Sequence, residues 1–92
     1  MIADAESQTL LLVDDDQIFR ERLAQALRKR NHEVWTAGDA EQALQIANVE
    51  SPELAIVDLR MPGQSGLDLV RALLDIDPDT RILVLTAYGS IA

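Results

Sequence analysis

The run from Leu54 to Asp58 constrains the fold of this chain more than any other stretch. Four apolar residues end in a single carboxylate, and Pro62-Gly63 follows within five residues. A continuous apolar run bounded by turn signals is typical of a strand buried on both faces of a sheet. Asp58 is therefore expected at the carboxyl edge of that sheet, where α/β proteins bind their ligands.

Length and composition narrow the kind of protein. The 92 residues suffice for one domain, and we expect a disordered lead-in over residues 1–8 and a domain over residues 9–92. The net charge of −8 argues against nucleic-acid binding, and the absence of cysteine excludes disulfides, thiolate metal sites and a cysteine nucleophile. The acidic N-terminus is unlike a signal peptide, and no apolar run is long enough to span a membrane.

Strands and helices are expected to alternate along the chain. Short apolar or β-favouring runs predict strands at 10–13, 33–37, 54–58 and 81–85. Helical spacing predicts a helix from Ile18 to Arg30, a second from an Asp39–Gln42 capping box to before Pro52, and a third capped by Ser65. The apolar faces expected for the first and third helices are Ile18, Phe19, Leu23, Ala26 and Leu27, and Leu67, Val70, Leu73 and Leu74. This alternation implies a parallel sheet with right-handed crossovers and helices on both faces.

The carboxyl ends of the first, third and fourth strands should meet on one edge of this sheet. They carry Asp14 and Asp15, Asp58, and Thr86. Two ionised carboxylates about 4 Å apart repel by roughly 4 kcal/mol at an effective dielectric of 20, so either one is protonated or a cation lies among them. Mg²⁺ suits such a site, because it binds a few carboxylates and completes its shell with waters and phosphate oxygens. Asp58 could then bind the metal and attack a phosphoryl group, to which Thr86 could donate its hydroxyl.

These residues also have purely structural interpretations. Asp14, Asp15 and Asp16 could cap the helix that follows, and for the triplet alone this explains the sequence as well as a metal site does. We assign Asp16 to capping. Asp58 differs, because a carboxylate that ends an apolar strand gains nothing from capping. Gly63 and Gly66 serve turn geometry or let the backbone approach a phosphoryl group.

Three motifs resemble those of bacterial response-regulator receiver domains. They are Leu-Leu-Leu-Val-Asp-Asp-Asp at 10–16, Ile-Val-Asp-Leu-Arg-Met-Pro-Gly at 56–63 with Gly66, and Val-Leu-Thr-Ala-Tyr-Gly at 84–89. The resemblance implies a flavodoxin-like (CheY-like), doubly wound α/β fold. It also implies that Asp58 accepts a phosphoryl group from a sensor histidine kinase. Asp14, Asp15, Asp58 and the backbone carbonyl of Arg60 would hold Mg²⁺, while Thr86, as the switch residue, and the backbone N–H of Ala87 would contact the phosphoryl group.

The same resemblance has implications beyond the site. It implies that the chain is a cytoplasmic signalling domain and not an enzyme, with at most slow self-phosphorylation and self-dephosphorylation. More narrowly, the sequence resembles redox-responsive regulators of the RegA/PrrA/ActR type, in which a receiver precedes a Fis-like helix-turn-helix domain. This implies a DNA-binding output domain, absent from this chain, and a role in transcription.

The sequence departs from the family pattern in one respect. That pattern continues with the rest of a fourth helix, a fifth strand carrying a lysine and an aromatic residue, and a fifth helix, whereas the only lysine here is Lys29. We therefore expect a truncated receiver of strand order 2-1-3-4, with Arg81–Leu85 as an exposed apolar edge. Such a chain should self-associate, most readily as a dimer, through this strand or the adjacent surface. It should keep the metal site but switch poorly.

Two other functions fit parts of the sequence. Asp14-x-Asp16 with Ile18 imitates the signature of haloacid-dehalogenase-like phosphatases, in which Asp14 would be the nucleophile. Position 18 does not match that signature, and the chain is short for that fold. The other candidate is a pseudo-receiver that binds partners without phosphorylation. Phosphorylation of Asp58 or of Asp14 distinguishes a receiver from such a phosphatase, and failure to bind Mg²⁺ at millimolar concentration would favour a pseudo-receiver.

Overall fold

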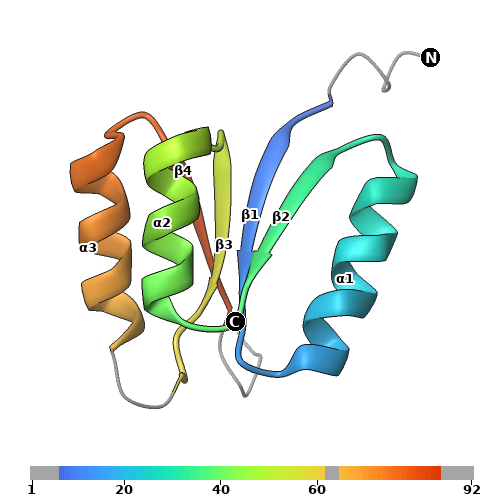
Figure 1. The fold of residues 1–92 in the computed structure, drawn as a ribbon, viewed down its shortest axis with the longest axis horizontal. Helices are drawn as coiled ribbons and strands as arrows, with labels where there is room; N and C mark the ends of the chain where they lie inside the picture. Colours follow the sequence, from blue (N-terminus) through green and yellow to red (C-terminus); the bar gives the residue numbers. More distant parts are fainter. Residues whose placement is uncertain (1–6, 62–64, 86–92) are drawn as a thin grey trace.

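The computed structural model describes residues 7–61 and 65–85. Strands and helices alternate through this part of the chain (Figure 1). The elements are β1 (Thr9–Val13), α1 (Gln17–Lys29), β2 (Glu33–Ala37), α2 (Ala40–Glu50), β3 (Leu54–Asp58), α3 (Gly66–Ile76) and β4 (Arg81–Leu85). The predicted β-α-β-α-β-α-β order is confirmed, and each predicted strand agrees with the observed one to within a residue.

The four strands form one parallel sheet in the order β2-β1-β3-β4, as predicted. Helix α1 covers one face, and α2 and α3 lie side by side on the other (Figure 1). The register pairs Val13 of β1 with Val57 of β3, and Asp58 of β3 with Leu85 of β4. Since all strands point the same way, the carboxyl ends of β1, β3 and β4 lie at one edge of the sheet.

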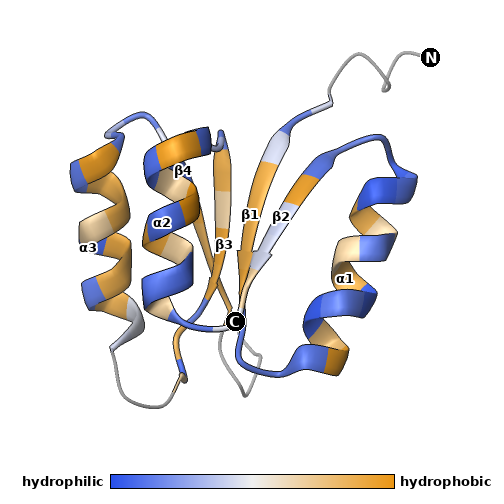
Figure 2. Ribbon diagram, in the orientation of Figure 1, coloured by the Kyte–Doolittle hydropathy of each residue, from blue (hydrophilic) through white to orange (hydrophobic). Residues whose placement is uncertain are grey.

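The core is apolar on both faces of the central strands. Leu11, Val13, Ala55 and Val57 pack under α2 and α3, while Leu10, Leu12 and Ile56 pack under α1. Figure 2 shows that β1 and β3 are apolar along most of their length, whereas α1 is hydrophilic over much of its surface. The interpretation of 54–58 as a strand buried on both faces is thus confirmed for its central residues.

The predicted apolar face of α1 is partly wrong. Ile18 is 69% exposed and Phe19 43% exposed, because the first turn of α1 lies at the carboxyl edge of the sheet, where the strands end. Ala26 is exposed as well, and Ala24 is buried in its place. Only Leu23 and Leu27 of the predicted set pack against the sheet.

The face of α3 needs a similar correction. Val70 and Leu73 pack in the core as predicted, but Leu67 is exposed and Leu69 is fully buried. The buried set Gly66, Leu69 and Leu73 includes a glycine, which hydrophobic periodicity does not detect.

The N-terminal segment is joined to the fold from residue 7 onward. Ser7 Oγ donates to the carbonyl of Asn31, and the backbone N–H of Gln8 donates to Nδ1 of His32. In the described part of the chain, no helix has both the length and the apolar character needed to cross a membrane.

Candidate functional site

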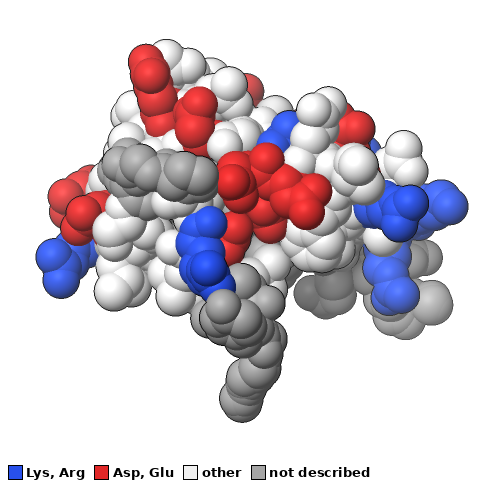
Figure 3. Space-filling view, turned by 90° about the horizontal axis from the view of Figure 1, so that it is seen from below, with Lys and Arg blue, Asp and Glu red and all other residues white. Residues whose placement is uncertain are grey.

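A pocket of about 510 Å³ opens at the carboxyl edge of the sheet. Its lining residues are Asp14, Asp15, Asp16, Phe19, Asp58, Arg60 and Leu85. Seen from this edge, acidic side chains gather at the middle of the molecular surface (Figure 3). The pocket is therefore acidic, with an apolar wall contributed by α1 and the end of β4.

Three carboxylates converge in this pocket. Oxygen atoms of Asp14, Asp15 and Asp58 all lie within 4.8 Å of one another. Asp14 and Asp15 follow β1, and Asp58 ends the neighbouring strand β3, so the parallel register brings them together. Asp14 is 6% exposed, Asp58 is half-buried and Asp15 is exposed, so the cluster runs from the core out to solvent.

Backbone amides orient these carboxylates. Asp14 Oδ1 accepts a hydrogen bond of 2.9 Å from the N–H of Asp16, and Asp58 Oδ1 accepts one of 3.0 Å from the N–H of Arg60. Asp16 accepts from the N–H of Phe19 and caps α1, so its assignment to capping is confirmed. Asp14 and Asp15 are not the helix cap, which leaves them available for another role.

The environment of Asp14 disfavours its ionised form. Burial raises the pKa of this carboxyl, the N–H of Asp16 opposes that effect, and the charges of Asp58, Asp15 and Asp16 raise the pKa further. A bound cation would offset both the burial and the repulsion. The donor set, carboxylate oxygens at a partly exposed site, is the kind that Mg²⁺ prefers. The residues present therefore fit a divalent cation.

The segment after Asp58 is anchored by packing. Met61 is buried in the core beneath α2 and α3. A Cβ atom added to Gly66 would lie 2.7 Å from the Cα of Leu59 and 3.2 Å from the carbonyl oxygen of Asp58. Gly66 thus lets the start of α3 pack directly on the backbone that follows Asp58, which favours the structural interpretation of this glycine.

Not every predicted site residue can be placed. Thr86, Ala87 and Gly63 lie outside the described residues. Arg60 lines the pocket, and the binding of Mg²⁺ by its backbone carbonyl stays a prediction. Sequence reasoning missed Phe19, which it assigned to the core. The available signal was its position, three residues after the capping aspartate and so in the first turn of the helix.

Comparison with known proteins identifies the family. Residues 10–92 match the model of the response regulator receiver domain. The photosynthetic apparatus regulatory protein RegA of Cereibacter sphaeroides is 47% identical over 92% of this chain and 46% of its own length. A response regulator from Burkholderia pseudomallei, solved with a phosphorylated aspartic acid, calcium and citrate, is 41% identical with a TM-score of 0.85, over 92% of this chain and 50% of that one. A complex of histidine kinase ThkA with response regulator protein TrrA gives 35% identity and a TM-score of 0.81, over 90% of this chain and 72% of the matched one.

The fold and the acidic edge pocket thus define a receiver domain. The chain belongs to the response regulator receiver family, and its sequence is similar to RegA. The choice between a receiver and a haloacid-dehalogenase-like phosphatase is settled in favour of the receiver. The chain spans about half the length of the curated relatives it matches first.

Proposed function

We propose that this receiver domain accepts a phosphoryl group on Asp58 from a sensor histidine kinase, in a reaction that depends on Mg²⁺. The observation that carries the proposal is the convergence of three carboxylates within 4.8 Å, one of them at the end of the central strand β3. Two similar structures support the proposal. One response regulator contains a phosphorylated aspartic acid, and another response regulator is in complex with a histidine kinase.

Asp58 is the nucleophile in this account. A carboxylate oxygen attacks phosphorus, an O–P bond forms, and the P–N bond to the kinase histidine breaks. The electron pair of that bond stays on the imidazole nitrogen, which then takes up a proton. The N–H of Arg60 holds Asp58 Oδ1, which fixes the orientation of the carboxylate for in-line attack.

Asp14, Asp15, Asp58 and the backbone carbonyl of Arg60 would hold the metal. A bound Mg²⁺ neutralises charge on the equatorial phosphoryl oxygens during transfer. Without a cation, the approaching phosphoryl group would meet three carboxylates and be repelled. The chain therefore supplies oxygen ligands and a fixed nucleophile, and the cation would supply positive charge among these carboxylates.

Thr86 and the N–H of Ala87 would contact the phosphoryl oxygens. The geometry of β4 supports this, because Leu85 is paired with Asp58 and its carbonyl accepts a 3.0 Å hydrogen bond from the N–H of Leu59. Strand β4 therefore ends beside Asp58, at the carboxyl edge of the sheet. Thr86 would serve as the switch residue. It would move towards the phosphoryl group and so transmit phosphorylation of Asp58 to the surface of the domain.

The domain would act within a larger regulator. We place it in the cytoplasm, joined to a DNA-binding output domain outside these 92 residues, and acting as a signalling domain rather than an enzyme. Its similarity to RegA over about half of that protein's length supports this arrangement. Transcription would be the regulated process.

The 92-residue chain by itself would self-associate through β4. Leu83 is 50% exposed and Val84 36% exposed, and β4 is the outer strand of the sheet in the described part of the chain. At the opposite edge, Arg28 Nη2 donates to the carbonyl of Val34 and so occupies part of β2. An apolar strand at a sheet edge favours pairing with another chain. Sedimentation at micromolar concentration should detect a dimer, and a well-folded monomer would contradict this part of the proposal.

Chemical labelling tests the phosphoacceptor role. The chain is incubated with acetyl phosphate and Mg²⁺, the acyl phosphate is reduced with borohydride, and the modified aspartate is mapped by mass spectrometry. We expect the modification on Asp58. Modification of Asp14 would contradict the assignment of the nucleophile. No modification, together with no Mg²⁺ binding at millimolar concentration, would identify a pseudo-receiver.

A further inference from the structure

Arg20 lies on the face of α1 that turns towards the sheet. The residues of this helix that are buried or half-buried occur at positions i, i+3, i+4 and i+7, which are Arg20, Leu23, Ala24 and Leu27. A cationic side chain thus occupies a position that an apolar residue would normally fill. Side chains of a helix lean towards its N-terminus, so the guanidinium of Arg20 points back to the β1–α1 junction.

The guanidinium holds the backbone next to the acidic cluster. Arg20 Nη1 donates a 2.6 Å hydrogen bond to the carbonyl oxygen of Asp14. The N–H of Asp14 donates to the carbonyl of Ala37 at the end of β2, at 3.1 Å. The peptide groups on both sides of the Asp14 Cα are therefore fixed, one by β2 and the other by α1.

The surroundings of Arg20 are arranged for a guanidinium, not only for a long aliphatic chain. A Cβ atom added to Gly38 would lie 3.1 Å from Arg20 Nη1, so the absence of a side chain at Gly38 leaves room for the guanidinium group. The Nε atom is buried and has no hydrogen-bond partner among the described residues. Burial of an unsatisfied donor opposes folding, so packing alone does not account for arginine at this position.

We propose that Arg20 is a positioning residue for the metal and phosphoryl site. The carbonyl that it holds belongs to the peptide group joining Asp14 to Asp15, and the orientation of that group sets the distance between the two carboxylates. Like charges in the cluster tend to separate them, and Arg20 keeps the junction in place. This inference rests on the proposed function only in taking Mg²⁺ as the cation bound there.

Arg20→Met tests the inference, because it retains an apolar side chain of similar length and removes the guanidinium. We expect the Mg²⁺ dissociation constant, measured from amide chemical shifts, to rise roughly tenfold, as for other residues that orient metal ligands. The rate of Asp58 labelling by acetyl phosphate should fall at low Mg²⁺ and return close to the wild-type rate at saturating Mg²⁺. Arg22→Met, an exposed position on the same helix, is the matched control and should change neither quantity.

Gly38→Ala tests the same contact, between Arg20 and the carbonyl of Asp14, without changing Arg20 itself. The new methyl group would lie 3.1 Å from Nη1, so the guanidinium must shift by a few tenths of an ångström; Mg²⁺ binding should weaken, by less than in Arg20→Met. In the double variant Arg20→Met/Gly38→Ala, the alanine should have no further effect, because the group that it displaces is gone. Additive losses in the double variant would contradict the contact as the cause.

Other outcomes separate the two proposals. Wild-type Mg²⁺ affinity in a folded Arg20→Met variant would overturn the positioning role, even if its melting temperature fell. If that variant does not fold, unchanged Mg²⁺ binding in Gly38→Ala would overturn it instead. A wild-type chain that binds Mg²⁺ in an Arg20-dependent way, yet is not labelled on Asp58, would overturn the phosphoacceptor role alone. Failure of the wild-type chain to bind Mg²⁺ would overturn both.

Discussion

Two aspartates at opposite ends of the sheet have pKa values that are shifted in opposite directions. At the carboxyl end, burial and neighbouring negative charges raise the pKa of Asp14. At the amino end, the hydroxyl of Ser51 and then the N–H of Asp79 lower the pKa of Asp77. The same residue type is thus stabilised as an anion at one end and destabilised at the other. Asp77 is hydrogen-bonded by Ser51 and Asp79, whereas Asp14 lies among like charges where a cation could bind.

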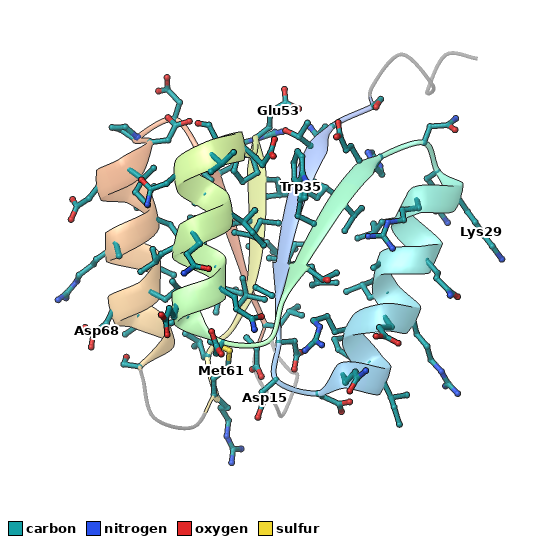
Figure 4. The ribbon with its side chains drawn as sticks, viewed as in Figure 1. Asp15, Lys29, Trp35, Glu53, Met61 and Asp68 are labelled. Atoms are coloured by element: carbon teal, nitrogen blue, oxygen red, sulfur yellow. The ribbon has the colours of Figure 1, made fainter. Side chains whose placement is uncertain are left out.

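Hydrogen bonds at the amino end join residues far apart in the sequence. Glu53 Oε1 accepts from the N–H and Oγ1 of Thr9, at 2.9 and 3.3 Å. The buried hydroxyl of Thr80 donates to the carbonyl of Pro52 at 3.2 Å. In Figure 4, Glu53 lies at this end, and Asp15 lies at the other. These hydrogen bonds therefore connect the starts of β1, β3 and β4.

Asp58→Asn should have the largest effect, because it removes the nucleophile. We expect complete loss of acetyl-phosphate labelling, since an amide does not attack phosphorus. Asp77→Asn, at the opposite end, is the matched control and should be labelled like the wild type. If Asp58→Asn were labelled at the wild-type rate, the phosphoacceptor would be another residue.

Asp15→Ala should separate metal binding from stability. It removes a proposed ligand, so Mg²⁺ binding should weaken by roughly tenfold or more. It also removes a like charge from the cluster, so the melting temperature without Mg²⁺ should stay the same or rise. Calorimetry with and without Mg²⁺ measures both effects. A large fall in melting temperature without Mg²⁺ would contradict the second.

Thr80→Val should affect stability alone. The substitution leaves the carbonyl of Pro52 without the donor that the structure gives it, which should cost about 1 kcal/mol in the free energy of unfolding. Denaturant unfolding measures this loss. The Mg²⁺ dissociation constant should not change, and a change in it would mean that the two ends are coupled.

Ser51→Ala should have the smallest effect, seen only in the pH dependence of stability. Asp77 has a lowered pKa in the folded chain, so it contributes stability above its ordinary pKa, near 3.8, and this contribution is lost as the pH falls through the lowered value. Removing the Ser51 hydroxyl should bring the pKa of Asp77 back towards its ordinary value. Melting temperatures of variant and wild type should differ at neutral pH and converge at strongly acidic pH. A difference that does not vary with pH would exclude this linkage.

The sequence predicts one end of the sheet far better than the other. Apolar runs that stop at Asp14 and Asp58 indicate both the strands and the acidic edge, because strand ends and site residues coincide there. The contact between Ser51 and Asp77 joins residues 26 apart, and no local pattern marks it. Arg20 was missed for a related reason: hydrophobic periodicity cannot detect a charged residue on a buried helix face.

We expect the carboxyl end of the sheet, and not the amino end, to bind a cation. The most direct test is a map of amide chemical shifts during titration with Mg²⁺. We expect saturable shifts at Asp14, Asp15 and Arg60, and none at Glu53 or Asp77. Shifts of equal size at both ends, or no saturable shift at the carboxyl end, would contradict this expectation.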